Sequence, residues 1–172
     1  MVLALSGLLA GSATAAEPAR QPAAKPATAR PAPFDARAPA SLLDLFAANG
    51  ANARLSTSSP GGARLEVTTP AYGFGVDYVG CDSTGRGCQA LAFSTASERR
   101  VTLAQINVFN QTSLNCRVFQ DAAGKTHIAY STLLSRSDTR QEMEMHVAAW
   151  RGCLTEFGEF LRDPVGYLAA AP

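Results

Sequence analysis

Residues 72–81, YGFGVDYVGC, form the stretch that decides the fold. Side chains alternate between the two faces of an extended chain, so Tyr72 and Phe74 share one apolar face while glycines and Cys81 share the other. The next apolar stretch, residues 88–95 (CQALAFST), alternates in the same way. Two such stretches predict neighbouring antiparallel strands, with the aromatic face directed toward the core.

The same alternation makes a prediction about the four cysteines. Cys81 and Cys88 fall on the small-residue faces of the two predicted strands, as a cross-strand disulfide requires. Four cysteines allow three connectivities, and this face matching favours Cys81–Cys88, which leaves Cys116–Cys153. Zinc is the rival interpretation, but the Cys81-x6-Cys88 spacing is wider than that of common zinc sites. We therefore expect two disulfides, no metal and no cofactor.

Residues 1–16 have the pattern of a secretory signal peptide. A short apolar run is followed by Ala13-Thr14-Ala15, a small-x-small cleavage pattern. The run is too short to cross a bilayer, which takes about 20 apolar residues. No Lys or Arg precedes it, which fits either a weak signal or a start codon assigned too late. We predict a periplasmic or secreted protein of a Gram-negative bacterium, with no membrane span after signal cleavage.

The composition divides the remaining chain into a tether, a domain and a tail. Residues 17–40 are mostly Ala and Pro, which predicts a semi-extended tether. The folded domain is expected over residues 41–163, with a short tail at 164–172. Four of the 15 basic and two of the 14 acidic residues precede Ser41. The chain from Ser41 onward therefore has 11 basic and 12 acidic residues. This balance argues against nucleic-acid binding, which takes a concentrated basic face.

The domain is expected to be α+β, with three helices and an antiparallel sheet of five to six strands in the order α-β-β-β-β-α-β-β-α. Ser41 is the predicted N-cap of the first helix, which Gly50 is expected to end. The other two helices are predicted to start at capping boxes that begin at Thr102 and Thr139. A turn is expected at Pro60-Gly61-Gly62. The expected strands are residues 53–58, 64–69, 72–81, 88–95, 115–120 and 126–134.

The last helix has the clearest pattern in the chain. Apolar residues follow one another at spacings of 4, 3, 4, 3 and 4: Met143, Val147, Trp150, Leu154, Phe157 and Leu161. This seam predicts a long helix packed on one face of the sheet and ended by Pro164, although a heptad seam also fits a coiled-coil partner. Cys153 lies beside the seam, where it could reach Cys116.

Three motifs together resemble one known family. They are Tyr78-Val79-Gly80-Cys81, Cys88-Gln89-Ala90-Leu91-Ala92-Phe93 and Ile106-Asn107-Val108-Phe109-Asn110. Over roughly residues 41–161 the chain resembles the YbjN-like family, whose members are often labelled bacterial sensory-transduction regulators. The resemblance implies the fold of type III secretion chaperones and a binding or regulatory role. Residues 133–138 (LLSRSD) depart from the family, whose members tend to carry an acidic residue and a Gly-Gly turn there.

The candidate binding residues are Asn107, Asn110, Tyr72 and Phe74. An Asn near a helix end more often bonds local backbone, which is the structural alternative. No nucleophile motif joins Ser, His and Asp, and no nucleotide-binding glycine pattern is complete.

We therefore predict an exported, non-enzymatic module that binds an unknown protein or peptide partner, with a homodimer left open. The alternative is a periplasmic small-molecule sensor or carrier that uses the Tyr72/Phe74 side of the sheet near Asn107. A hydrolase built on His127 or His146 ranks last.

Overall fold

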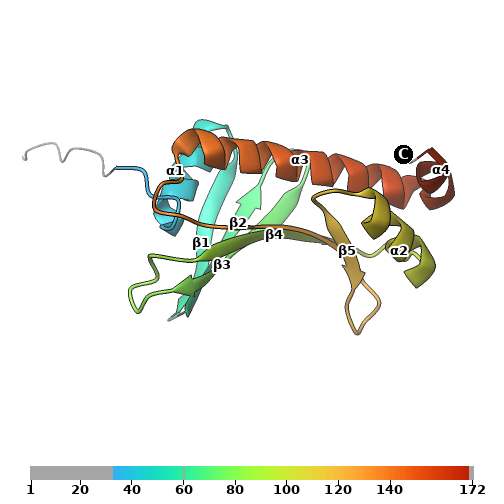
Figure 1. The fold of residues 1–172 in the computed structure, drawn as a ribbon, viewed down its shortest axis with the longest axis horizontal. Coiled ribbons are helices and arrows are strands. Elements are labelled where there is room, and N and C mark those ends of the chain that lie inside the picture. The colour runs from blue at the N-terminus through green and yellow to red at the C-terminus, as the bar shows by residue number, and fades with distance from the viewer. Residues whose placement is uncertain (1–32, 60, 171–172) are drawn as a thin grey trace, which may run out of the picture. The chain divides into compact units, whose positions relative to one another are not determined.

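In the part of the domain that the structure describes, six antiparallel strands lie together with four helices (Figure 1). The computed structural model describes residues 33–59 and 61–170. The predicted signal peptide, most of the tether, Pro60 and the last two residues lie outside this description. The elements are α1 Pro39–Ala48, β1 Asn52–Ser59, β2 Gly61–Thr68, β3 Gly73–Cys81, β4 Ala90–Ser97, α2 Leu103–Thr112, β5 Arg117–Gln120, β6 Thr126–Leu133, α3 Arg140–Arg162 and α4 Pro164–Ala170.

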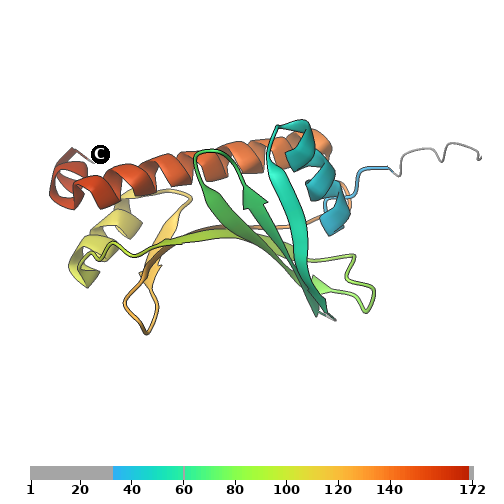
Figure 2. The same cartoon turned by 180° about the vertical axis from the view of Figure 1, so that it is seen from behind.

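The α+β class, the order of the first nine elements and the packing of the long helix on the sheet are confirmed. The strands lie in the order β1-β2-β3-β4-β6-β5, all antiparallel. Figure 1 shows α3 running across the strands on one side of the sheet, with α1 near its beginning and α2 and α4 near its end. Figure 2 shows the same arrangement from behind. The two ends of α3 therefore have different neighbours.

Both predicted capping boxes are present. The Thr102 hydroxyl accepts from the Gln105 N–H at 3.2 Å, and the Gln105 side chain accepts in return from the Thr102 N–H at 2.9 Å. Thr139 and Glu142 repeat this exchange at the start of α3. Each box satisfies two N–H groups that the first helical turn leaves without partners, so these helix starts are encoded locally.

The prediction for the first helix is wrong at its start. The helix α1 begins at Pro39 with Ala38 as the N-cap, and no side chain caps it. Proline suits the first helical position because its fixed φ is already helical and it has no N–H to leave unpaired. The Ser41 hydroxyl instead accepts from the Asp35 N–H at 3.1 Å. Residues 33–38, expected to be tether, therefore belong to the domain, and Ala36 is buried in its core.

Two further boundaries differ from the predictions. Gly61 and Gly62 were expected in a turn, but both lie in β2. The expected tail contains a fourth helix, α4, which carries too few residues to show an apolar period. Asp163 supports its start by accepting from the Gly166 N–H at 3.0 Å. The Tyr167 ring then packs on Phe109 and Phe160, with ring centroids 5.8 Å away in both cases.

The buried stripe of α3 departs from the predicted heptad seam after Trp150. Met143, Val147, Trp150 and Phe157 are buried as expected, but Leu154 and Leu161 are only partly buried. Cys153 and Phe160 are buried instead. A straight helix has 3.6 residues per turn, so a strict seven-residue repeat drifts around it by about 20° per heptad. The buried side of α3 therefore moves to neighbouring positions in the second half of the helix.

The aromatic face of β3 is the core face, as predicted. Phe74 and Phe93 pack against Trp150 with ring centroids 5.6 and 5.8 Å away. On the opposite face the Arg64 side chain lies over Gly75 and pairs with Asp77 at 2.5 Å. A Cβ at position 75 would meet only the guanidinium end of this flexible, partly exposed side chain, which would have to shift to make room.

Both predicted disulfides form, Cys81–Cys88 and Cys116–Cys153. Val79 pairs with Ala90 in the register of β3 and β4. Continuing that register by two residues on each strand brings Cys81 opposite Cys88. The alternation in the sequence places both cysteines on matching strand faces, and this is why the pairing could be predicted. Cys153 lies on the buried side of α3, facing Cys116 at the entrance to β5.

Candidate binding groove

The four predicted binding residues occupy two separate parts of the domain. Asn110 bonds the backbone of Val118 twice, accepting from its N–H at 2.8 Å and donating to its carbonyl at 2.9 Å. Asn107 lies on an exposed side of α2. Phe74 is buried among Phe46, Phe93 and Trp150, and Tyr72 lies beside it at the exposed edge of this cluster. None of the four lines either pocket described below.

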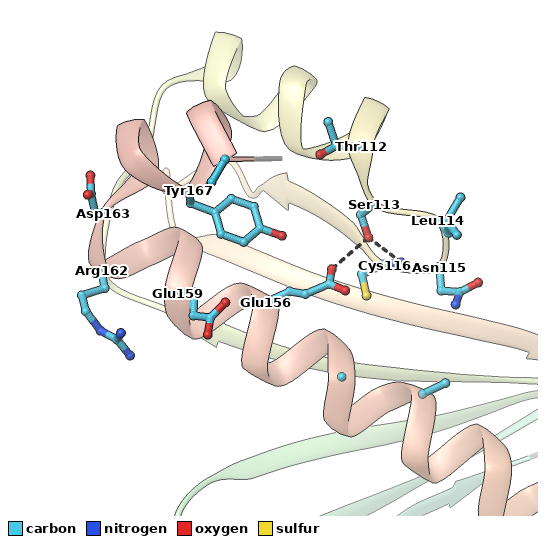
Figure 3. A pocket seen from close by; sticks show the side chains of 13 residues that line it. Thr112, Ser113, Leu114, Asn115, Cys116, Glu156, Glu159, Arg162, Asp163 and Tyr167 are labelled. Carbon is cyan, nitrogen blue, oxygen red and sulfur yellow. Dashed lines mark hydrogen bonds between the residues drawn. The ribbon is translucent and has the colours of Figure 1, made fainter. Parts of the chain in front are cut away.

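A groove of about 740 Å³ lies where the second half of α3 meets α4 and the connection from α2 to β5 (Figure 3). Residues 112–116 of that connection form one wall. Residues of α3 between Ala149 and Arg162, spaced three or four apart, form the base with the C-cap Asp163, and Tyr167 and Ala170 of α4 close one end. The groove therefore brings together three segments that no local sequence pattern connects.

The base of the groove follows one stripe of α3. Ala149, Gly152, Glu156 and Glu159 recur at spacings of 3, 4 and 3, which places them on one face of a helix. The first two have little or no side chain, whereas the last two are carboxylates. One end of the groove therefore lets a ligand approach the helix backbone closely, and the other end presents negative charge.

A hydrogen bond holds the wall against this stripe. The Ser113 hydroxyl donates to the Glu156 carboxylate at 3.1 Å and accepts from the Cys116 N–H at 3.3 Å. Figure 3 shows both bonds. The Cys116–Cys153 disulfide joins the same two segments covalently beneath the groove. The Glu156 carboxylate is thus held in a defined place and does not swing freely in solvent.

The aromatic end of the groove is anchored in the core. Tyr167 stacks on Phe109, and the Phe109 and Phe160 rings lie 4.9 Å apart. Burial first, and then the charges of Glu156 and Glu159, raise the pKa of the Tyr167 phenol. The phenol stays neutral at physiological pH and can donate a hydrogen bond to a ligand.

The lining charges favour a cationic ligand. Glu156, Glu159 and Asp163 supply three carboxylates, and Arg162 supplies the single guanidinium. A concave site lined by one sign of charge concentrates the opposite sign. The Ser113 hydroxyl in this lining already donates to one of the carboxylates, that of Glu156.

Part of this groove had a signal in the sequence. The stripe from Ala149 to Glu159 has helical spacing and lies next to the apolar seam, but a polar stripe beside a core face is usually solvated. The contributions of Ser113 and Tyr167 had no such signal. They depend on how α2 and α4 pack against α3, which only the tertiary structure shows.

Comparison with known proteins finds no match among family models, curated proteins or solved structures. The resemblance to the YbjN-like family therefore stays a prediction. The two disulfides fit an oxidising location, either extracellular or periplasmic. Among the helices of residues 33–170 that are described, none has the length and apolar character needed to span a bilayer. The described side chains likewise form no group of three or more His, Cys, Asp or Glu placed to hold a metal ion.

Proposed function

We propose that this protein is a non-enzymatic binding module that acts after export to the bacterial periplasm and captures a cationic peptide segment of a protein partner. The observation that carries the proposal is the acidic groove beside an open stretch of α3. The predicted signal peptide and the two disulfides support the periplasmic location. The resemblance to the YbjN-like family, with its chaperone-like fold, supports a role in binding protein chains.

The shape of the groove favours an extended peptide over a compact ion. A Cβ added at Gly152 would meet no heavy atom within 4 Å, so the space above this part of α3 is open. Leu114, 90% exposed on the opposite wall, offers an apolar contact to a ligand side chain. A peptide could place its backbone over Gly152, an apolar side chain against Leu114 and a Lys or Arg near Glu159. Such charge complementarity would mainly set the specificity and the association rate.

Peptide binding measured by fluorescence anisotropy tests the proposal. The probes are a labelled eight-residue peptide of alternating Lys and Ala and a matched peptide of Glu and Ala, each added to the full chain with both disulfides formed. We expect binding of the Lys peptide only. The Glu156→Gln/Glu159→Gln variant should weaken it about tenfold, equivalent to about 1.4 kcal/mol. The Asp44→Asn/Glu144→Gln variant, with the same change in net charge, should not.

A steric variant separates the groove from the overall charge. Gly152→Leu should block the base of the groove, and Gly158→Leu is its matched control. Gly158 also lies on α3, also has open space around it, and does not line the groove. Loss of Lys-peptide binding in Gly152→Leu alone supports the proposal. Equal binding by both variants, or no preference for the Lys peptide, would refute it.

A further inference from the structure

A second hollow, of about 640 Å³, lies near the beginning of α3, at the end opposite to the acidic groove. The helix has 23 residues, so its ends are separated by roughly 34 Å at 1.5 Å per residue. Three segments border the hollow: residues 34–37, the disulfide-closed loop 82–87, and Arg136 just before α3. Each of these segments contributes one arginine.

Arg37 is fixed in place by the loop. Its Nε donates to the Cys88 carbonyl at 3.2 Å, and its Nη2 donates to the Gly87 carbonyl at 2.5 Å. The Cys88 N–H donates in return to the Arg37 carbonyl at 3.0 Å. The guanidinium is therefore oriented before any ligand arrives. This reduces the side-chain conformational entropy that would be lost on binding.

The loop that presents Arg86 is also rigidly built. Asp82 Oδ1 accepts from the Thr84 N–H at 2.8 Å, the Thr84 hydroxyl at 2.6 Å and the Arg86 N–H at 3.1 Å. The Cys81–Cys88 disulfide closes the loop at its base. The Asp82 carboxylate is thus largely occupied by its own loop.

The charges around the hollow are not balanced. Its three guanidiniums face two carboxylates, Asp82 and Asp35, and Asp35 accepts from the Arg37 N–H at 3.0 Å. Within the described part of the chain, the side chains of Arg86 and Arg136 make no hydrogen bond or ion pair. Two guanidinium forks therefore remain available, and a guanidinium binds phosphate or carboxylate oxygens through paired N–H groups.

We propose that this hollow binds a small organic anion through a phosphate or carboxylate group, with Phe34 against the apolar body of the ligand. The oxyanion would accept from Arg86 and Arg136, while Arg37 would hold the loop in place. This site shares no lining residue with the acidic groove and does not depend on the function proposed there.

Amide NMR titration of the full, oxidised chain tests the proposal. The probes are phenyl phosphate, benzoate and neutral benzyl alcohol. We expect saturable shifts of the Gly87 and Cys88 amides with the two anions and none with the alcohol. Phenyl phosphate binding more tightly than benzoate would assign the site to phosphate esters, and equal binding would assign it to oxyanions in general. Both results support the site.

The variants decide whether the arginines are responsible. Arg86→Ala/Arg136→Ala should weaken anion binding at least tenfold while leaving the fold intact, because neither side chain bonds within the described residues. Arg140→Ala/Arg151→Ala removes the same charge from the exposed side of α3 and should leave binding unchanged. The proposal is overturned if anions shift only amides elsewhere, if benzyl alcohol binds equally well, or if both double variants lose affinity alike.

Discussion

The Ser113 hydroxyl donates to the Glu156 carboxylate at 3.1 Å, although the two residues lie 43 positions apart in the chain. This bond joins the connection after α2 to the outer side of α3, above the Cys116–Cys153 disulfide. One contact thereby positions both a wall of the acidic groove and one of its charges. The groove therefore depends on the tertiary packing of α2, α3 and the connection to β5.

The two asparagines of α2 should differ sharply in their effect on stability. Asn110→Ala removes both hydrogen bonds to Val118 and leaves that backbone N–H and carbonyl without their partner. We expect it to lower the free energy of unfolding by about 1–3 kcal/mol. Asn107→Ala, on the exposed side of the same helix, should change it by less than about 0.5 kcal/mol. Urea unfolding measures both, and equal effects would contradict this account of Asn110.

Trp150 should be the most costly residue to truncate in α3. It is fully buried between Phe74 and Phe93, so Trp150→Ala should cost about 3–5 kcal/mol. Its indole N–H is buried with no partner among the described residues. Trp150→Phe keeps a ring and removes that N–H, so we expect a loss below about 2 kcal/mol. A loss under about 1 kcal/mol for Trp150→Ala in urea melts would mean that the helix does not pack on the sheet.

The two disulfides should contribute unequally to stability. Cys116 and Cys153 are 37 positions apart and Cys81 and Cys88 only 7. The chain-entropy relation therefore assigns about 4 kcal/mol to the first and about 2.5 kcal/mol to the second. Unfolding of the Cys116→Ser/Cys153→Ser and Cys81→Ser/Cys88→Ser variants measures the difference. The first variant should also lose affinity for the Lys peptide, because its disulfide supports the groove.

Stability should fall in alkali because of Tyr78. Burial first, and then the charge of Asp35, raise the pKa of its phenol well above 10 in the folded state. The unfolded chain ionises near pH 10, so above that pH it binds fewer protons than the folded chain. The stabilisation is complete below pH 10 and should decline by up to about 1.4 kcal/mol per pH unit as the pH rises toward the folded-state pKa. Urea melts between pH 9 and 11 should show a smaller decline in Tyr78→Phe. An identical decline in both proteins would contradict the assignment.

The sequence by itself determined the features that depend on neighbours along the chain. The capping boxes at Thr102 and Thr139 need only residues three positions apart, and the alternation through residues 72–81 needs only the pleat of a strand. Together with the strand register, that alternation was sufficient to pair Cys81 with Cys88. The α+β class and the order of nine elements follow from the same local patterns.

Only the tertiary structure decided which residues at the ends of the chain's elements are buried and which residues meet in a pocket. Ala36 and Ala38, ahead of α1, are buried in the core, and α4 forms where Tyr167 can stack on Phe109. The buried stripe of α3 shifts from Leu154 to Cys153 because a straight helix of 3.6 residues per turn does not keep a seven-residue repeat on one side. Both pockets lie where segments far apart in the sequence meet. Their residues could not be grouped from the sequence, because side-chain proximity across such distances is set by the packing of the whole domain.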